Sequence, residues 1–366
     1  MNLLFLIAIV FSLYVLKPIV VPLLIAAILS VAIFPLVLFF EVKLKFNRLF
    51  SSLISITLLL IVITSLVVFI GYQLSDILTK GDTYIEKLTQ LYQNCMHEFE
   101  LRLGIKKNEL SGSRFNLGKS IKDNFDTIAQ FITASGSVFG DLILIPLYMF
   151  FFLLYRKFFK SFIFKVFVKE GNSNKIKTIL TKLYDVQLNY LFGLITVMGI
   201  VGIMNSLGLL LLGIENPIFY GFLAAFLLLI PYIGILIGSL IPALIALVTK
   251  DSAWYSVGVI GIFMFIQFLE GNFITPKITG SKVSINSLVA ILSLIVFSML
   301  WGIAGMILAL PITASLKILF DSQPHLKPYG FLLGEPNDLY LNSTARVRLK
   351  KWKKIRMAKI KSSDSF

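Results

Sequence analysis

The side chains best suited to chemistry lie in one run, Gln267 to Lys277, at the end of a long apolar stretch. The run reads QFLEGNFITPK and places a carboxylate, two amides and a hydroxyl beside a proline. An ionisable group at membrane depth is costly unless it is paired or hydrated, so it marks a site by default. We expect the proline to stop the helix, and a broken helix exposes backbone groups that bind solutes or ions. The run therefore predicts a substrate or ion pathway formed by Gln267, Glu270, Gly271, Asn272, Thr275 and Pro276.

Other acidic residues near the apolar stretches could carry protons. Asp141, which precedes Pro146, and Asp185 are candidate proton-linked acids. Each also suits the solvated start of a helix, where a carboxylate is favourable. Glu270 has an alternative as well, an ion pair with Lys277 or Lys282 at the membrane interface. The sequence leaves these alternatives open.

Signatures of enzymatic chemistry are absent from the sequence. The nearest approach to a phosphate-binding loop, Gly112 to Ser120, has five residues between its glycines where the motif needs four. There is no GxSxG, HExxH or CxxC motif. One cysteine and two histidines cannot build a Cys- or His-rich metal site, so we predict no metal and no cofactor. A secondary transporter, a channel or a structural membrane protein fits better than an enzyme.

Composition places these residues in an integral membrane protein. The 366 residues are 57% hydrophobic and 14% charged, with a mean hydropathy of +0.88. Soluble domains have about 45–50% apolar and roughly 25% charged residues. The net charge of +15 would suit nucleic acid, but the charges lie between long apolar runs. We therefore expect no nucleic-acid partner.

Apolar stretches long enough to span a bilayer predict an all-α, polytopic protein. A crossing of roughly 30 Å needs about 20 apolar residues. About eight transmembrane segments are expected, at 2–16, 18–40, 49–73, 134–155, 191–214, 216–249, 252–272 and 287–320.

Two of these stretches are too long for one crossing and are interrupted. Residues 216–249 contain Pro231, Gly234, Gly238 and Pro242, and residues 287–320 contain Gly302, Gly305 and Pro311. Proline and glycine weaken or break helices. Each stretch is thus one long kinked helix or a helical hairpin, and we favour hairpins, with these residues as breaks or hinges. The glycines also suit close helix packing.

Charge asymmetry predicts the orientation. Basic residues crowd the loop 41–48, the segment 156–182 and the tail from Arg346 to Lys361, which places all three in the cytoplasm. Residues 74–133 carry amphipathic helical spacing and mixed charge, so we expect an extracytoplasmic helical insertion. With an even number of crossings, both termini are cytoplasmic. The tail should also attract anionic lipid.

The predicted organisation follows from these assignments. Residues 1–73 hold three spans, 74–133 the outer helices, and 134–155 a further span. Residues 156–190 form a basic amphipathic segment in the inner headgroup layer. A transporter core occupies 191–320, and 321–366 form the basic tail.

Several of these motifs together resemble the autoinducer-2 exporter family of permeases. They are Pro231-Tyr232-Ile233-Gly234 with Gly238 and Pro242; Gln267-x-x-Glu270-Gly271-Asn272 with Pro276 and Gly280; Trp301-Gly302-x-x-Gly305 with Pro311 and Lys317; and Ile145-Pro146-Leu147-Tyr148 before Arg156. The resemblance covers roughly residues 5–322. It implies a bacterial inner-membrane, multi-pass, homo-oligomeric protein that exports a small solute, with autoinducer-2 as the namesake. Some relatives resemble sodium/proton antiporters.

The sequence thus predicts a secondary transporter for a small solute or an ion. The two broken stretches would move or gate, with the Gln267–Pro276 run at the pathway. A cation/proton antiporter is the first alternative, and its intramembrane acids would be indispensable. A membrane scaffold that transports nothing is the second, and it would tolerate stiffened hairpins.

Overall fold

The computed structural model describes residues 2–103, 138–167, 173–229, 233–278, 285–335 and 352. Regular structure in these ranges is entirely helical, as predicted. The helices are α1 (Asn2–Val15), α2 (Lys17–Val42), α3 (Arg48–Thr79), α4 (Gly81–Leu103), α7 (Val138–Leu154), α8 (Arg156–Phe167), α9 (Ser173–Leu211), α10 (Pro217–Leu227), α11 (Ile233–Thr249), α12 (Trp254–Leu269), the π-helix η2 (Glu270–Ile274), α13 (Thr275–Ile278), α14 (Ser287–Trp301), α15 (Ile303–Ser322) and α16 (Lys327–Leu333).

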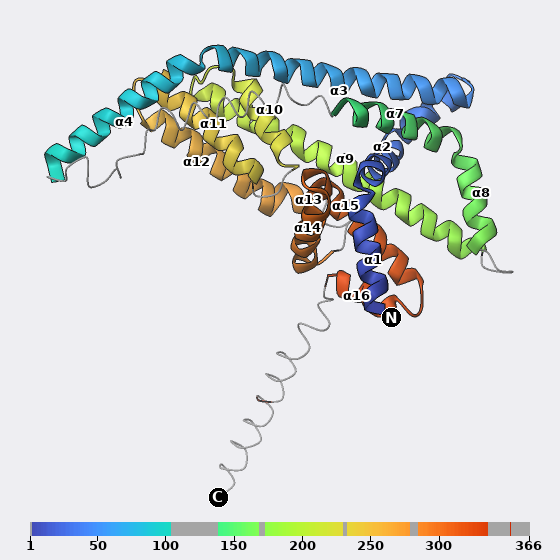
Figure 1. Cartoon of the computed structure of the whole chain (residues 1–366). Coiled ribbons are helices and arrows are strands. Elements are labelled where there is room, and N and C mark those ends of the chain that lie inside the picture. The colour runs from blue at the N-terminus through green and yellow to red at the C-terminus, as the bar shows by residue number, and fades with distance from the viewer. Residues whose placement is uncertain are drawn as a thin grey trace, which may run out of the picture.

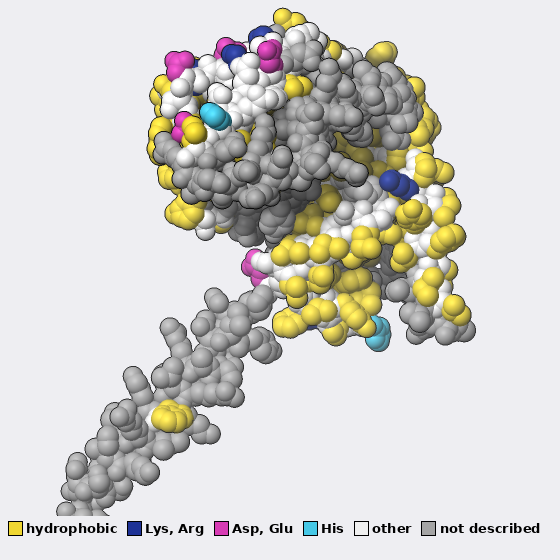
Figure 2. Space-filling model, turned by 60° about the vertical axis from the view of Figure 1, so that its left-hand side comes forward, with side chains coloured by type: hydrophobic (Ala, Val, Ile, Leu, Met, Phe, Trp, Pro, Cys, Tyr) yellow, Lys and Arg dark blue, Asp and Glu magenta, His cyan; other side chains and the backbone are white. Residues whose placement is uncertain are grey.

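The described helices form a polytopic membrane protein. Five segments are long and apolar enough to cross a bilayer, namely Lys17–Val42, Arg48–Gln73, Ser173–Leu211, Trp254–Ile278 and Ile303–Ser322. Their large apolar side chains point outward as well as inward, and on α3 Ile61, Val67 and Val68 are all exposed. Hydrophobic side chains cover much of the described surface in Figure 2, and charged ones gather at the upper left, over α4. Hydrocarbon is the solvent that such a surface requires.

The first two predicted spans are joined by a bend. The backbone N–H of Leu16 donates to Ser12, and that of Val20 donates to Leu16, so helical hydrogen bonding continues across the junction. Pro18 occupies the first turn of α2, where its missing N–H costs nothing. The two antiparallel spans expected from the sequence are not formed. Helix α1 is about 21 Å long, so it is too short to cross a bilayer. The count of spans therefore no longer determines on which side of the membrane the amino terminus lies.

Helix α9 is the centre of the molecule. It contacts α2, α8, α10, α12 and α15 and runs diagonally through Figure 1 between the α10–α12 group and α8. A single helix joins the predicted basic segment to the predicted span, because nothing in residues 173–211 breaks it. Small residues let α10 approach α9: a Cβ at Gly221 would overlap the backbone of Ser206. Helices in membranes associate through such close contacts of small residues.

The stretch 216–249 is a helical hairpin. Helices α10 and α11 contact each other, and a Cβ at Gly234 would overlap the carbonyl oxygen of Leu227 across the hairpin. A Cβ at Gly238 would come within 2.7 Å of the Cβ of Ala224. Pro231, expected at the break, lies outside the described residues. Since α10 is about 16 Å long, it cannot cross a bilayer alone.

The stretch 287–320 is a second hairpin. Gly302 connects α14 to α15 with φ of +68°, a left-handed conformation that glycine adopts without strain. Three residues later, a Cβ at Gly305 would overlap the carbonyl oxygen of Phe297. Farther along the two arms from the turn at Gly302, the Thr313 hydroxyl donates to Ser293 Oγ at 2.9 Å. The prediction of hairpins over kinked single helices is thus confirmed by contacts between the arms.

Two of the residues predicted as helix breaks do not interrupt their helices. Pro242 lies inside α11 and Pro311 lies inside α15, and both helices continue through them. Neighbouring helices supply polar contacts close to both prolines. The Ser256 hydroxyl donates to the carbonyl of Ala243, and the Gln187 amide donates to the carbonyl of Pro311 at 2.8 Å and to Ser315 Oγ at 2.7 Å.

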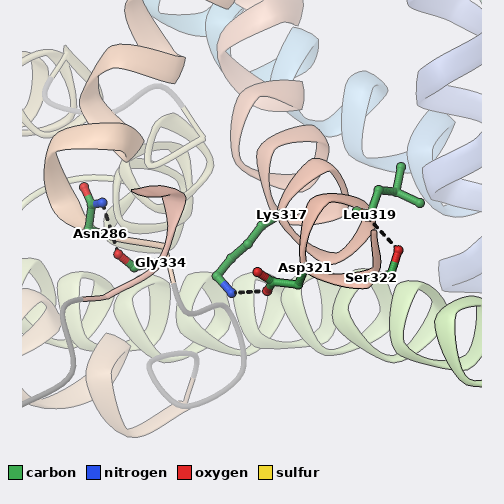
Figure 3. A network of polar contacts seen from close by, with 6 residues as sticks. All are labelled: Asn286, Lys317, Leu319, Asp321, Ser322 and Gly334. Atoms are coloured by element: carbon green, nitrogen blue, oxygen red, sulfur yellow. Dashed lines mark hydrogen bonds and ion pairs between the residues drawn. The ribbon is translucent and has the colours of Figure 1, made fainter. Parts of the chain in front are cut away.

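A polar network ties the second hairpin to α16 (Figure 3). The Asn286 Oδ1 accepts from Val289 N–H at the start of α14, while Nδ2 donates to the carbonyls of Leu332 and Gly334. Lys317 and Asp321 form an ion pair of 2.6 Å one turn apart on α15. Asn286 thereby caps α14 and anchors the end of α16 at once.

The predicted extramembrane helices are described in part. Helix α4 confirms the amphipathic helix expected within 74–103 but begins only at Gly81, because α3 extends to Thr79. Its Lys87 donates to the carbonyl of Val248 at 3.4 Å, so α4 lies against the end of α11. The amphipathic spacing over 115–132, and all of the polybasic stretch from Arg346 to Lys361 except Trp352, lie outside the described residues.

The second hairpin can be tested by a disulfide. In a chain whose only cysteine, Cys95, is replaced by serine, the pair Ser293→Cys and Thr313→Cys should form a disulfide on mild oxidation, because the two hydroxyl oxygens are 2.9 Å apart. Met299 and Met306 lie between the two positions. Cyanogen bromide should therefore separate the fragments only after reduction. The pair Ser287→Cys and Thr313→Cys is the control, and equal crosslinking of both pairs would contradict the hairpin register.

Candidate functional site

The run around Glu270 forms a widened helical turn. Residues Glu270–Ile274 are a π-helix between α12 and α13, and the backbone N–H of Thr275 donates to the carbonyl of Glu270, five residues back. Pro276 does not stop the helix as predicted, because α13 continues to Ile278. Instead, proline has no N–H and its ring collides with the carbonyl four residues earlier, which favours a wider preceding turn. Such π-turns are frequent at functional sites.

The Glu270 carboxylate is held by two neutral donors. The Gln267 amide donates to Oε2 at 2.7 Å, and the Thr275 hydroxyl donates to Oε1. All three side chains are half-buried. In the described part of the chain no basic side chain pairs with this carboxylate, and Lys277 is exposed without reaching it. The predicted partner Lys282 lies outside the described residues.

A small cavity beside this turn links it to the first hairpin. The cavity measures about 10 Å³ and is lined by Gln267, Asn205 of α9, Leu228 and Ile235 at the hairpin tip, and Val201, Ala224, Phe263 and Ile266. That volume is close to the smallest that holds one water molecule. Asn205 is 3% exposed, and its Oδ1 has no hydrogen-bond partner in the described chain. A buried carbonyl oxygen without a donor is a binding group for a water, a solute or a cation.

Apolar packing positions the turn against α9. Ile274 and Ile278 pack in one apolar cluster with Val197, Val201, Ala225 and Ile266. The face of η2 that carries Gly271 and Asn272 is exposed. Asn272 uses its amide to donate to the carbonyl of Phe268 at 2.9 Å. The structure therefore brings together Gln267, Glu270 and Thr275, and it turns Gly271, Asn272 and Pro276 outward.

The other candidate acids are not part of this cluster. Asp185 is exposed on α9, two residues before the buried Gln187. Asp141 lies in the first turn of α7, and its side chain is outside the described part of the structure. Among the described residues, no three His, Cys, Asp or Glu side chains gather as metal ligands would. Asn205 is not among the site residues predicted from the sequence, because a lone amide inside an apolar run is more often a helix–helix hydrogen bond.

These features define a class. Helical hairpins and a polar, non-α turn among membrane spans are features of many membrane transport proteins, where interrupted helices build the substrate site. The chain belongs to the AI-2E family of transporters, whose family model matches residues 3–324. It is a transporter-family protein and not an enzyme.

Relatives in several bacteria are named as putative transport proteins or permeases. "Putative transport protein YueF" of Bacillus subtilis is 26% identical over 315 residues, 82% of each chain. A "Putative transport protein" of Haemophilus influenzae is 25% identical over 337 residues, 87% of this chain and 91% of that one. "Putative transport protein YrrI" of Bacillus subtilis is 35% identical, but over 131 residues that make up 36% of each chain.

Proposed function

We propose that this protein is a secondary transporter that exports a small solute across a bacterial inner membrane. The observation that carries the proposal is the Glu270 carboxylate, held by Gln267 and Thr275 in a π-turn beside the tip of the α10–α11 hairpin. The polar groups form a site within apolar helices, and the hairpins supply elements that can move around it.

The cargo to test first is autoinducer-2, which the family name suggests. The relatives' names specify transport without a substrate. The exposed apolar faces of the spans suit both lipid and further copies of the chain, and we propose a homo-oligomer. The basic tail would hold anionic lipid on the cytoplasmic side.

Cation/proton antiport is the second candidate, and one observation favours it. Both hydrogen-bond partners of Glu270 are neutral, so its negative charge is uncompensated in the described chain. A carboxylate in that state can exchange a proton for a cation. The unpartnered Asn205 oxygen nearby would add a neutral ligand for that cation.

Purified protein in liposomes tests both candidates. Vesicles loaded with autoinducer-2 should lose it faster than protein-free vesicles when a proton or sodium gradient is imposed. An antiporter should instead move protons when sodium is added, as read by the fluorescence of trapped pyranine. A protein that raises neither flux above that of protein-free vesicles would contradict both candidates.

The orientation of the protein is tested by thiol labelling of intact cells. In a Cys95→Ser background, Lys45→Cys and Lys165→Cys should react with a membrane-impermeant maleimide only after the cells are opened. Gln90→Cys on α4 should react in intact cells. Its segment carries mixed charge, which is tolerated outside the cell, whereas segments dense in basic residues stay in the cytoplasm. Labelling of Lys165→Cys in intact cells would reverse the assignment.

A further inference from the structure

A cavity of about 870 Å³ lies between α2, α7, α8 and α9. It shares no lining residue with the small cavity beside Gln267. Its volume is within the range of sites that bind small molecules, roughly 300–1,000 Å³. The walls are mainly apolar, with Ala27, Val31, Phe34, Leu38, Leu153 and Ile163 among them. The residues from Ala27 to Leu38 extend about 16 Å along α2, so the cavity is elongated.

The lining carries positive charge and no carboxylate. Arg156, Lys157, Lys160 and Lys177 border the cavity. Arg156 is fixed in place by an ion pair with Glu41 and lies over the Phe34 ring, 5.1 Å from its centre. The three lysines are exposed, and none pairs with a carboxylate in the described part of the chain. The cavity therefore has an uncompensated cationic rim.

Two buried polar groups at the cavity have no partner. Ser30 is 6% exposed, and its hydroxyl has no hydrogen-bond partner in the described chain. The Nη1 atom of Arg156 is buried and unpartnered as well. Ser30 lies one turn of α2 from Phe34, so Ser30 and Arg156 line the same part of the cavity, but the two donor atoms themselves are covered by neighbouring groups. The exposed lysines are therefore the charged contacts that the cavity offers to a ligand.

The position of α8 puts the mouth of the cavity in the headgroup layer. This helix alternates lysines with phenylalanines, and its Phe158 and Phe162 are exposed. A short helix of that composition lies flat at the membrane interface. Hence the cationic rim faces lipid headgroups, while the apolar walls continue along α2 and α7 toward the hydrocarbon.

We propose that this cavity binds one anionic phospholipid drawn from the bilayer. The phosphate lies at Lys157, Lys160 and Lys177. One acyl chain follows the apolar wall past Phe34 and Leu153. This site is separate from the Glu270 turn and does not depend on which solute the protein transports. Its occupant would fasten α8 to the spans α2 and α9.

Lipid retention measured by native mass spectrometry tests the site. The purified full-length protein is equilibrated with phosphatidylglycerol or phosphatidylcholine in detergent micelles. The variant with Lys157, Lys160 and Lys177 all changed to Gln should retain phosphatidylglycerol about 100-fold more weakly, since each cation contributes to attraction at a membrane surface. The matched control changes Lys165, Lys175 and Lys182 to Gln, which removes the same charge from exposed positions of α8 and α9 outside the cavity. That control should retain the lipid as the unchanged protein does.

Two further experiments distinguish a lipid from other occupants of the cavity. Ala27→Trp fills the apolar end without altering charge and should also release phosphatidylglycerol, whereas glycerol phosphate, a headgroup without chains, should not compete. Equal loss in both lysine variants, equal retention of phosphatidylcholine, or competition by glycerol phosphate would overturn the proposal. So would protection of the three lysines from acetylation in lipid-free oligomers, because a second copy of the chain would then cover the cavity. Circular dichroism confirms that each variant keeps its helix content.

Discussion

Replacing Glu270 by alanine is expected to reduce flux through the reconstituted protein at least about tenfold while the protein still assembles. The change removes the acceptor for both the Gln267 amide and the Thr275 hydroxyl. Hydrogen bonds to a charged group contribute about 1.5–3 kcal/mol each, and a tenfold effect corresponds to about 1.4 kcal/mol. Without them, the π-turn loses the bonds that hold its side chains together.

The conservative change Glu270→Gln separates the two candidate functions. It keeps the shape and an acceptor oxygen but removes the charge. A neutral-solute exporter should then keep most of its flux, whereas an antiporter should lose sodium-driven proton movement. Glu215→Ala, an exposed residue just before α10, serves as the control and should change neither flux. A folded Glu270→Ala protein that transports at the normal rate would remove this turn from the pathway.

Replacing Gly234 by alanine is expected to destabilise the protein by at least about 3 kcal/mol, at the upper end of typical overpacking costs. The added methyl group would overlap the carbonyl oxygen and carbon of Leu227, which belong to the backbone of the facing arm and cannot rotate away. The α10–α11 hairpin must then open, which also moves Leu228 and Ile235 at the cavity beside Gln267.

Thermal unfolding in detergent, followed by circular dichroism, measures this effect. Gly199→Ala and Gly261→Ala are matched controls in membrane helices, because a Cβ at either position has no neighbour within 4 Å. Both controls should leave stability unchanged or raise it by up to about 1 kcal/mol through helix propensity. Gly305→Ala should behave like Gly234→Ala, since its Cβ would overlap the carbonyl of Phe297. A Gly234→Ala protein as stable as its controls would contradict the close packing of the hairpin.

The sequence by itself determined that this is an all-helical membrane protein with two interrupted stretches, because composition and the length of apolar runs can be counted along the chain. The class of transport proteins followed from the resemblance of its motifs to a family of permeases. Glu270 could also be predicted as a site residue from the sequence, because a carboxylate near the end of an apolar run is costly wherever the helices pack.

Only the tertiary structure decided what the interruptions do. Pro242 and Pro311 lie in continuous helices, whereas Gly302 makes a turn, although all three are expected to weaken a helix. Likewise, Leu16 to Val20 form a bend and not a loop. The contacts around these positions come from helices that are distant in sequence, since Gln187 of α9 donates to the carbonyl of Pro311 and Asn205 lines the same cavity as Gln267. Local patterns do not contain that information.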